Sequence, residues 1–225
     1  MTNPIFCAID TPSIERALTL ARAVAPYVGG LKLGLEFFMA EGPAGVRELA
    51  RLGKPVFLDV KLHDIPNTVA GAMRSLAPLD LAVINVHAAG GQAMMAAARE
   101  AMPMSTKVVA VTVLTSLDTD DLAATGVAGS ERVQVVRLAE LARSAGLDGI
   151  VCSAREVATL RARWTDGYFV TPGIRPAGGD LGDQKRVMTP QEAVAAGSSM
   201  LVIGRPITGA VDPAAAARAI AESLS

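Results

Sequence analysis

The sequence is poor in cysteine and in aromatic residues, and its charges almost cancel. Its two cysteines, Cys7 and Cys152, lie in apolar runs more than a hundred residues apart. Two thiols are too few for a disulfide framework, so we expect buried thiols and a reducing, cytoplasmic location. Aromatic residues make up 4% of the chain and the formal net charge is −1, which argues against nucleic acid or an anionic membrane as partner. A small molecule is the expected ligand.

Long hydrophobic runs are also missing. No uninterrupted apolar stretch reaches the ~18 residues of a membrane span, and the chain shows no basic segment followed by a long apolar one, as in a signal peptide. Hydrophobic residues still make up 51% of the sequence and charged residues 19%, a composition typical of a soluble protein with a large core.

Short apolar runs alternate with helical patterns along the whole chain. The runs cover residues 5–9, 31–34, 56–61, 82–87, 107–114, 149–152, 168–171 and 200–203, and helical spacing recurs at 14–24, 44–52, 133–144, 155–164 and 213–224. Nearly continuous Val, Ile and Leu is typical of parallel strands covered on both faces. Eight such units without a linker predict one (β/α)₈ TIM barrel forming a single catalytic domain over residues 1–225.

An open, doubly wound sheet is the main alternative architecture. It would favour a glycine-rich phosphate fingerprint after the first strand, but Asp10-Thr11-Pro12-Ser13 stands there. The one irregular stretch, residues 175–189, contains three glycines; it is either a lid over the site or a variable surface loop. Asp212 followed by Pro213 predicts the start of the last helix.

The third strand carries the strongest functional signal. Side chains alternate between the two faces of a strand, so Val56, Leu58, Val60 and Leu62 share an aliphatic face that suits the surrounding helices. Asp59 and Lys61 then point into the barrel, at the end where substrates bind. Burying unpaired charges costs several kcal/mol per ion, which favours a functional role over an ion pair that merely closes the barrel mouth.

A second lysine, Lys32, has the same inward parity on the preceding strand, although a lone strand lysine is often a solvated edge residue. We expect Lys32, Asp59, Lys61 and Asp64 to form an alternating row. Each charge would keep its neighbour ionised, and together they would present a fixed field to a substrate.

Other polar residues stand at strand ends, each with an alternative structural role. Asp10 is a candidate to accept hydrogen bonds from sugar hydroxyls, or else the N-cap of the helix after Pro12. Thr115 and Ser116 either face a polar ring or cap the next segment. His63 and His87 have no metal-like spacing, so we expect satisfied structural histidines and no metal site.

The loops after the last two strands resemble each other. The first contains Gly173 and Arg175, the second Gly204 and Arg205. A glycine lets backbone N–H groups approach an anion, and an arginine adds charge-assisted hydrogen bonds. Barrels often bind phosphate at this end, so a phosphate-bearing small molecule is expected, with Gln184 of the glycine-rich stretch reaching the same anion.

Three runs together resemble the orotidine 5′-phosphate decarboxylase family, in its bacterial form. They are LDVKLHDIPNT at residues 58–68, VTPGIRP at 170–176 and VIGRPI at 202–207. The resemblance extends from Asp10 to about Val211. It implies a cofactor-free and metal-free carboxy-lyase that converts orotidine 5′-monophosphate to UMP in the last step of de novo pyrimidine biosynthesis, acting as a homodimer.

The resemblance also implies roles for individual residues. Lys61 matches the lysine that protonates carbon 6, and Lys32, Asp59 and Asp64 match the rest of a charged tetrad. Asp64 and Thr68 would reach into the partner subunit's site. The implied substrate contacts are Asp10 at the ribose, Thr115 and Ser116 at the pyrimidine, Gln184, Gly204 and Arg205 at the phosphate with Arg175 nearby, and Ile65 and Pro172 from the matching motifs.

Two other functions remain possible for such a chain. Sister enzymes, the 3-keto-L-gulonate 6-phosphate decarboxylases and hexulose-phosphate synthases, share the Asp-x-Lys-x-x-Asp strand but bind Mg²⁺ through a glutamate where Lys32 stands here. An ammonium group at that place would repel the ion. The other alternative is a non-catalytic barrel that binds a nucleotide, for which the charged row would serve no purpose.

Overall fold

The computed structural model describes residues 3–176 and 188–224, which contain a closed barrel of parallel strands hydrogen-bonded in chain order. The barrel closes where β8 pairs with β1. The strands are β1 (Ile5–Ile9), β2 (Gly30–Leu33), β3 (Val56–Leu62), β4 (Val83–His87), β5 (Lys107–Val111), β6 (Gly149–Val151), β7 (Tyr168–Thr171) and β8 (Met200–Ile203). The predicted (β/α)₈ barrel is confirmed, and the open-sheet alternative is wrong.

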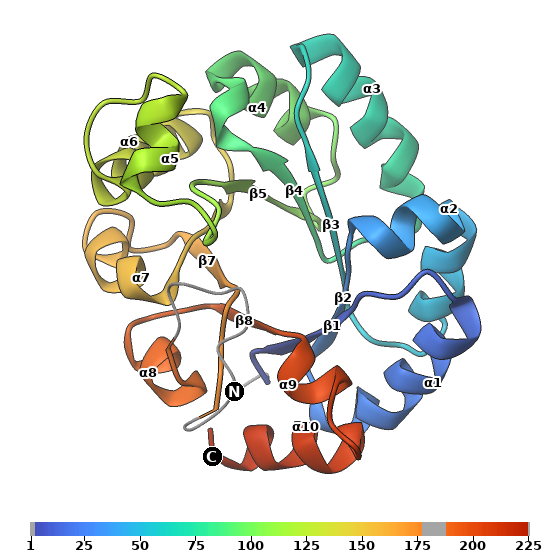
Figure 1. The fold of residues 1–225 in the computed structure, drawn as a ribbon. Helices are drawn as coiled ribbons and strands as arrows, with labels where there is room; N and C mark the ends of the chain where they lie inside the picture. Colours follow the sequence, from blue (N-terminus) through green and yellow to red (C-terminus); the bar gives the residue numbers. More distant parts are fainter. Residues whose placement is uncertain (1–2, 177–187, 225) are drawn as a thin grey trace.

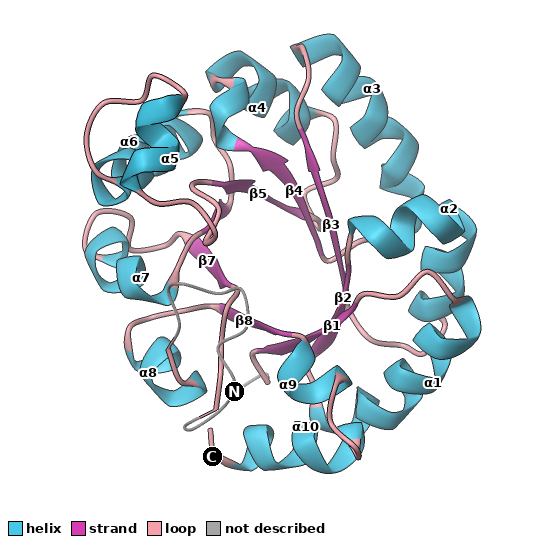
Figure 2. Ribbon diagram, in the orientation of Figure 1, coloured by secondary structure: helices cyan, strands magenta, loops and turns pink. Residues whose placement is uncertain are grey.

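Helices form a ring around the barrel (Figures 1 and 2). They are α1 (Ile14–Val24), α2 (Leu35–Ala50), α3 (Pro66–Leu76), α4 (Gln92–Glu100), α5 (Thr119–Ala124), α6 (Glu131–Ser144), α7 (Ala154–Arg161), α8 (Pro190–Ala195), α9 (Arg205–Thr208) and α10 (Pro213–Glu222), with 3₁₀ turns η1 (Ala25–Tyr27), η2 (Ala77–Leu79) and η3 (Ala88–Gly90). No helix in the described part of the chain is long and apolar enough to cross a membrane.

The hydrophobic core has two layers, separated by the barrel wall. Leu58 and Val60 belong to the large cluster between strands and helices, whereas Phe57 belongs to a smaller cluster with Val109 and Val170 inside the barrel. This division follows from the alternation of side chains along each strand. It confirms that the aliphatic face of β3 points outward and that the face bearing Asp59 and Lys61 points inward.

Several elements differ from the sequence-based expectation at their ends, and two of these differences have a clear structural cause. Helix α2 starts at Leu35, well before the predicted residue 44, because it continues across a kink where Gly42 has φ +59 and Pro43 follows. Strand β5 stops at Val111 rather than residue 114. The apolar residues beyond it, Val113 and Leu114, line a cavity at the barrel mouth, which explains their hydrophobicity without a strand.

The predicted helix cap is confirmed: the carboxylate of Asp212 accepts a hydrogen bond from the backbone N–H of Ala215, and Pro213 is the first residue of α10. Both cysteines are buried, and they form no disulfide with each other. Burial, followed by the nearby charge of Asp10, raises the pKa of the Cys7 thiol to about 12 despite the opposing effect of Lys32.

Candidate active site

Four charged side chains at the carboxyl ends of β1, β2 and β3 form a continuous row. Nζ of Lys32 is 3.1 Å from Oδ1 of Asp10 and 3.4 Å from Oδ2 of Asp59. On the other side of Asp59, Nζ of Lys61 is 2.7 Å from Oδ1. The expectation that Lys32 faces inward beside Asp59 is therefore confirmed, and charges of opposite sign alternate along the row.

The row becomes more accessible towards its ends. The Lys32 and Asp59 side chains are 8% and 14% exposed, against 35% for Lys61 and 46% for Asp10. Burial alone would raise the pKa of Asp59, but the ammonium groups of Lys32 and Lys61 and the hydrogen bonds from Lys61 and Asn85 outweigh it and hold that pKa below its usual value. Asp59 is therefore an anion at neutral pH, between two cations.

The side chains of Asp10 and Lys32 meet above Gly34, a residue whose role the sequence alone did not indicate. A Cβ atom on Gly34 would lie 2.1 Å from Oδ1 of Asp10 and 2.8 Å from Nζ of Lys32. Any side chain there would displace the ion pair. The role of Asp10 as a helix cap is excluded, because Ser13 is the N-cap of α1 and accepts from the backbone N–H of Arg16.

The backbone of Lys61 adopts an unusual conformation. Its φ of +50° lies in the left-handed region, which in a residue other than glycine costs about 1–3 kcal/mol and often marks a functional site. The register between β3 and β4 shifts at the same place, between Leu58 and Leu62. Asn85 of β4 contacts this irregularity, with Oδ1 accepting from the Lys61 N–H at 2.8 Å and Nδ2 donating to Oδ1 of Asp59 at 2.7 Å.

Asp64 does not join the row within this chain, so the expected row is only partly correct. Its carboxylate accepts a hydrogen bond from the backbone N–H of Ile65 at 2.6 Å, and Asp64 is exposed. Ile65 is 66% exposed and Thr68 is exposed as well. Within this chain the row therefore ends at Lys61 on one side, and on the other side it extends beyond Lys32 to Asp10.

A cavity of about 180 Å³ opens beside Asp59 and Lys61 inside the barrel mouth. Apart from these two charges its wall is mainly aliphatic and aromatic. The lining residues are Phe57, Asp59, Lys61, Val111, Val113, Leu114, Thr115, Val151, Cys152, Val170, Pro172 and Val202. Charges act more strongly in such surroundings than in water, so the ammonium of Lys61 faces a space suited to an anionic or polarised group.

Thr115 and Pro172 lie in the cavity wall, as expected of substrate contacts, whereas Ser116 is exposed and not among the lining residues. Neither Thr115 nor Ser116 is the N-cap of the next helix. Asp118 is the N-cap of α5, with Asp121 completing a capping box.

The two glycine–arginine loops follow β7 and β8, as predicted. Gly173, with φ +74 after Pro172, makes the turn that leads into Ile174, and Arg175 is buried with Nη1 donating to the Ile174 carbonyl at 3.0 Å. Gly204 is the N-cap of α9, and Arg205 is its exposed first residue. α9 lies beside β1 and β8 (Figure 1). Gln184 and most of the candidate lid, residues 177–187, lie outside the described residues.

The two histidines stack on each other next to the row. Their ring centroids are 5.6 Å apart with an interplanar angle of 24°. Burial lowers the pKa of His87, and electrostatic repulsion from His63 and Lys61 lowers it further. Nδ1 of His87 is buried and has no hydrogen-bond partner among the described residues, so the expected satisfied histidine is not confirmed for His87. Within residues 3–176 and 188–224, no cluster of His, Cys, Asp or Glu has the arrangement of a metal site.

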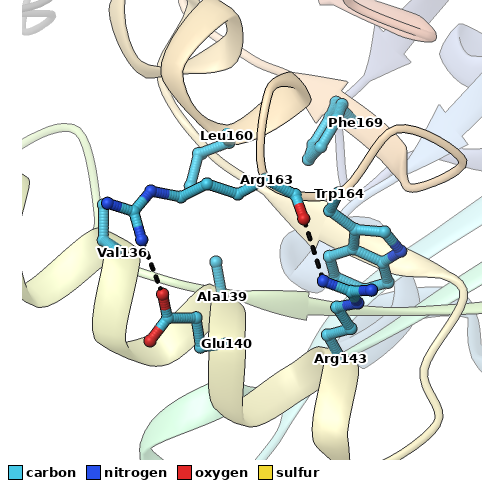
Figure 3. A pocket seen from close by; sticks show the side chains of 8 residues that line it. All are labelled: Val136, Ala139, Glu140, Arg143, Leu160, Arg163, Trp164 and Phe169. Carbon is cyan, nitrogen blue, oxygen red and sulfur yellow. Dashed lines mark hydrogen bonds and ion pairs between the residues drawn. The ribbon is translucent and has the colours of Figure 1, made fainter.

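A second hollow of about 270 Å³ lies outside the barrel, between α6 and α7 (Figure 3). Its polar groups contact one another: Arg163 pairs with Glu140 at 2.9 Å, and Arg143 donates to the Arg163 carbonyl at 2.9 Å. Trp164 is mostly buried and packs edge-on against Phe169, as expected of a core residue. The charged row therefore makes the barrel mouth the better candidate for chemistry.

Comparisons with known proteins identify the family of this chain. The model of the "Orotidine 5'-phosphate decarboxylase / HUMPS family" matches residues 3–220. Proteins named orotidine 5′-phosphate decarboxylase from Sphingopyxis alaskensis and Rhodospirillum rubrum are each 59% identical to this chain; the first alignment covers 100% of both chains, the second 99% of this one and 94% of the other.

Two solved structures share the fold of this chain over almost its whole length. The orotidine 5′-phosphate decarboxylase from Lactobacillus acidophilus is 35% identical, with a TM-score of 0.84 and 99% of each chain covered. An uncharacterized conserved protein from Geobacillus kaustophilus is 37% identical, with a TM-score of 0.85, covering 99% of this chain and 100% of the other. This chain belongs to the orotidine 5′-phosphate decarboxylase / HUMPS family.

Proposed function

We propose that this protein is a carboxy-lyase that converts orotidine 5′-monophosphate to UMP and carbon dioxide, the last step of de novo pyrimidine biosynthesis in the cytoplasm. The observation that carries the proposal is the contact of Lys61 with Asp59, 2.7 Å long and facing a largely apolar cavity. The full-length similarity to proteins named for this reaction supports it. We take residues 1–225 to act as one catalytic domain.

Lys61 carries the chemistry in this proposal. When the bond between carbon 6 and the carboxylate breaks, its electron pair stays on carbon 6, and the ammonium of Lys61 stabilises that negative charge. Lys61 then transfers a proton from Nζ to carbon 6 and regains one from solvent. Atoms and charges balance with no metal or organic cofactor, so none is proposed.

Asp59 and Lys32 support Lys61. The carboxylate of Asp59 holds the ammonium of Lys61 in place at 2.7 Å, and Lys32 in turn helps to lower the pKa of Asp59 and so keeps it ionised. Asp59 would also lie close to the substrate carboxylate, and the resulting repulsion would favour loss of carbon dioxide. The field of this row is fixed by buried ion pairs, so it need not reorganise as the reaction proceeds.

The remaining candidate residues would bind the nucleotide. The phosphate would take hydrogen bonds from Gly204, Arg205 and Gln184, with Arg175 nearby. The other proposed contacts are Asp10 at the ribose, and Thr115, Ser116, Ile65 and Pro172 at or around the pyrimidine. Binding energy from the phosphate, remote from carbon 6, would help to close the site and exclude water.

We further propose a homodimer in which Asp64 and Thr68 complete the site of the second copy. Both residues lie in an exposed run directly after β3 that also exposes Ile65. Neither Asp64 nor Thr68 belongs to the cavity lining of its own chain. An exposed apolar residue next to a catalytic strand is consistent with a partner surface.

The test is to follow the absorbance of orotidine 5′-monophosphate with purified protein in EDTA. Loss of the orotate absorbance supports the proposal. No turnover in EDTA, together with Mg²⁺-dependent turnover of 3-keto-L-gulonate 6-phosphate, would instead indicate the sister enzymes of the family. Binding of UMP without turnover of either substrate would indicate a nucleotide-binding barrel.

A further inference from the structure

Asn85 is a fully buried polar residue at the centre of an apolar strand. It is 0% exposed, and its neighbours Ile84 and Val86 are buried in the outer core. Its side chain therefore points into the barrel, on the same face of β4 as His87. A buried amide is costly unless its groups are hydrogen-bonded, so its partners indicate why it is there.

The register places Asn85 opposite the irregular part of β3. Leu58 pairs with Ile84 and Leu62 pairs with Val86, so β3 advances four residues while β4 advances two. Asn85 is the one residue of β4 between these pairs, and it faces the bulged segment from Asp59 to Lys61. A bulge re-aims side chains and leaves backbone groups without ladder partners.

The two ends of the Asn85 amide bond to the two functional residues of that bulge. Oδ1 accepts from the backbone N–H of Lys61 at 2.8 Å, and Nδ2 donates to Oδ1 of Asp59 at 2.7 Å. Only one orientation of the amide satisfies both, because a backbone N–H needs an acceptor and a carboxylate needs a donor. The same Asp59 oxygen also accepts from Nζ of Lys61, which closes a small hydrogen-bonded ring.

We propose that Asn85 is a positioning residue for the proposed decarboxylation: its amide holds Lys61 in the left-handed conformation and orients Asp59, so that the ammonium of Lys61 faces the cavity. The inference rests on the proposed function. Asn85 does not line the cavity, so it acts through Asp59 and Lys61 and not on the substrate itself.

The charges around Asp59 define what loss of Asn85 would change. Lys32 approaches from β2 and Lys61 from β3 itself, with Asp10 beyond Lys32 and His87 two residues along β4 from Asn85. The hydrogen bond from Asn85 is one of the contributions that lower the pKa of Asp59. Its removal raises that pKa, so protonation of Asp59 would inactivate the enzyme at a higher pH than in the wild type.

The experiment compares Asn85→Leu and Asn85→Ala with Thr112→Val. Leucine keeps the branched shape and number of side-chain heavy atoms of asparagine without its hydrogen bonds, and alanine removes both. Thr112 is a matched control: it is 3% exposed and its hydroxyl donates to the Val151 carbonyl at 2.9 Å, a hydrogen bond that involves neither Asp59 nor Lys61. Thr112→Val therefore reports the cost of losing a buried hydrogen bond as such.

For both Asn85 variants we expect kcat on orotidine 5′-monophosphate to fall about a hundredfold, KM to change less than about threefold, and the acid limb of the kcat–pH profile to move upward. Thr112→Val should retain the wild-type profile. Wild-type kcat and an unmoved acid limb in folded Asn85 variants would overturn the inference while leaving the proposed function intact. An inactive wild type would overturn both.

A measurement on the wild type keeps the test valid if the variants do not fold. The chain has asparagine only at positions 3, 67 and 85, so asparagine-selective ¹⁵N labelling gives three side-chain amide groups in an NMR spectrum. One of them should exchange slowly with solvent and change its chemical shift in Asp59→Ala, a substitution that adds no asparagine. Fast exchange of all three, or no response to Asp59→Ala, would contradict the hydrogen-bonded role of Asn85.

Discussion

Lys61 and Asp59 are two residues apart on the inward face of β3, and the ammonium nitrogen of Lys61 is 2.7 Å from Oδ1 of Asp59. An isolated charge inside a barrel would cost several kcal/mol and would tend to neutralise. Pairing in the row keeps both residues charged at the edge of an apolar cavity.

The stability of the fold should depend on ionised Asp59 at low pH. The folded-state pKa of Asp59 is below its usual value, so its contribution is fully present above the unfolded-state pKa of about 3.9 and is lost as pH falls through the folded-state pKa. Urea denaturation of wild type and Asp59→Asn between pH 7 and pH 3 measures this contribution. The difference in unfolding free energy should shrink as pH falls below 4, because all other carboxyl groups are common to both proteins. Parallel curves would contradict the ionised state.

Cys7 should be unreactive in the folded protein. Its pKa of about 12 leaves roughly one thiolate in ten thousand at pH 8, and the thiolate is the nucleophile. In a Cys152→Ser variant, where Cys7 is the only thiol, Ellman's reagent should react slowly before unfolding and rapidly in guanidinium chloride. Rapid reaction without denaturant would show that Cys7 is accessible.

Arg205 should matter only for substrates that carry a phosphate. We expect Arg205→Ala to raise the barrier for the nucleotide by several kcal/mol, each ~1.36 kcal/mol being tenfold in rate, with little effect on orotidine, which lacks the phosphate. Arg163→Ala serves as control, since Arg163 pairs with Glu140 outside the barrel. Equal losses on nucleotide and nucleoside would refute a remote phosphate anchor.

The barrel and most of the charged row could be predicted because they depend on local patterns. The alternation of residues 56–62 assigned Asp59 and Lys61 to the inner face, and the apolar runs located all the strands, three of them with their observed bounds. The observed bulge between Leu58 and Leu62 did not reverse this parity at Lys61.

What the sequence did not reveal depends on pairing between distant segments. Asn85 resembles any other polar residue in a strand until the register sets it opposite the bulge of β3. The reason for a glycine at position 34 can be recognised only from the structure, in which Asp10 and Lys32 occupy the space that a side chain would need. Asp64 was expected in the row from its spacing, but the chain turns outward after Leu62 and leaves Asp64 exposed. For Asn85, the one signal available in the sequence was the presence of an asparagine between Ile84 and Val86 in an otherwise apolar strand.

The most direct test of the central claim compares wild type, Lys61→Ala and Lys107→Ala on orotidine 5′-monophosphate in EDTA, with UMP binding measured for each. Lys107 is a barrel-strand lysine at the opposite end, above the ring of Tyr168. The account predicts turnover by wild type and Lys107→Ala, and no detectable turnover by a folded Lys61→Ala that still binds UMP. Comparable turnover by Lys61→Ala would contradict the assignment of carbanion stabilisation and proton transfer to Lys61.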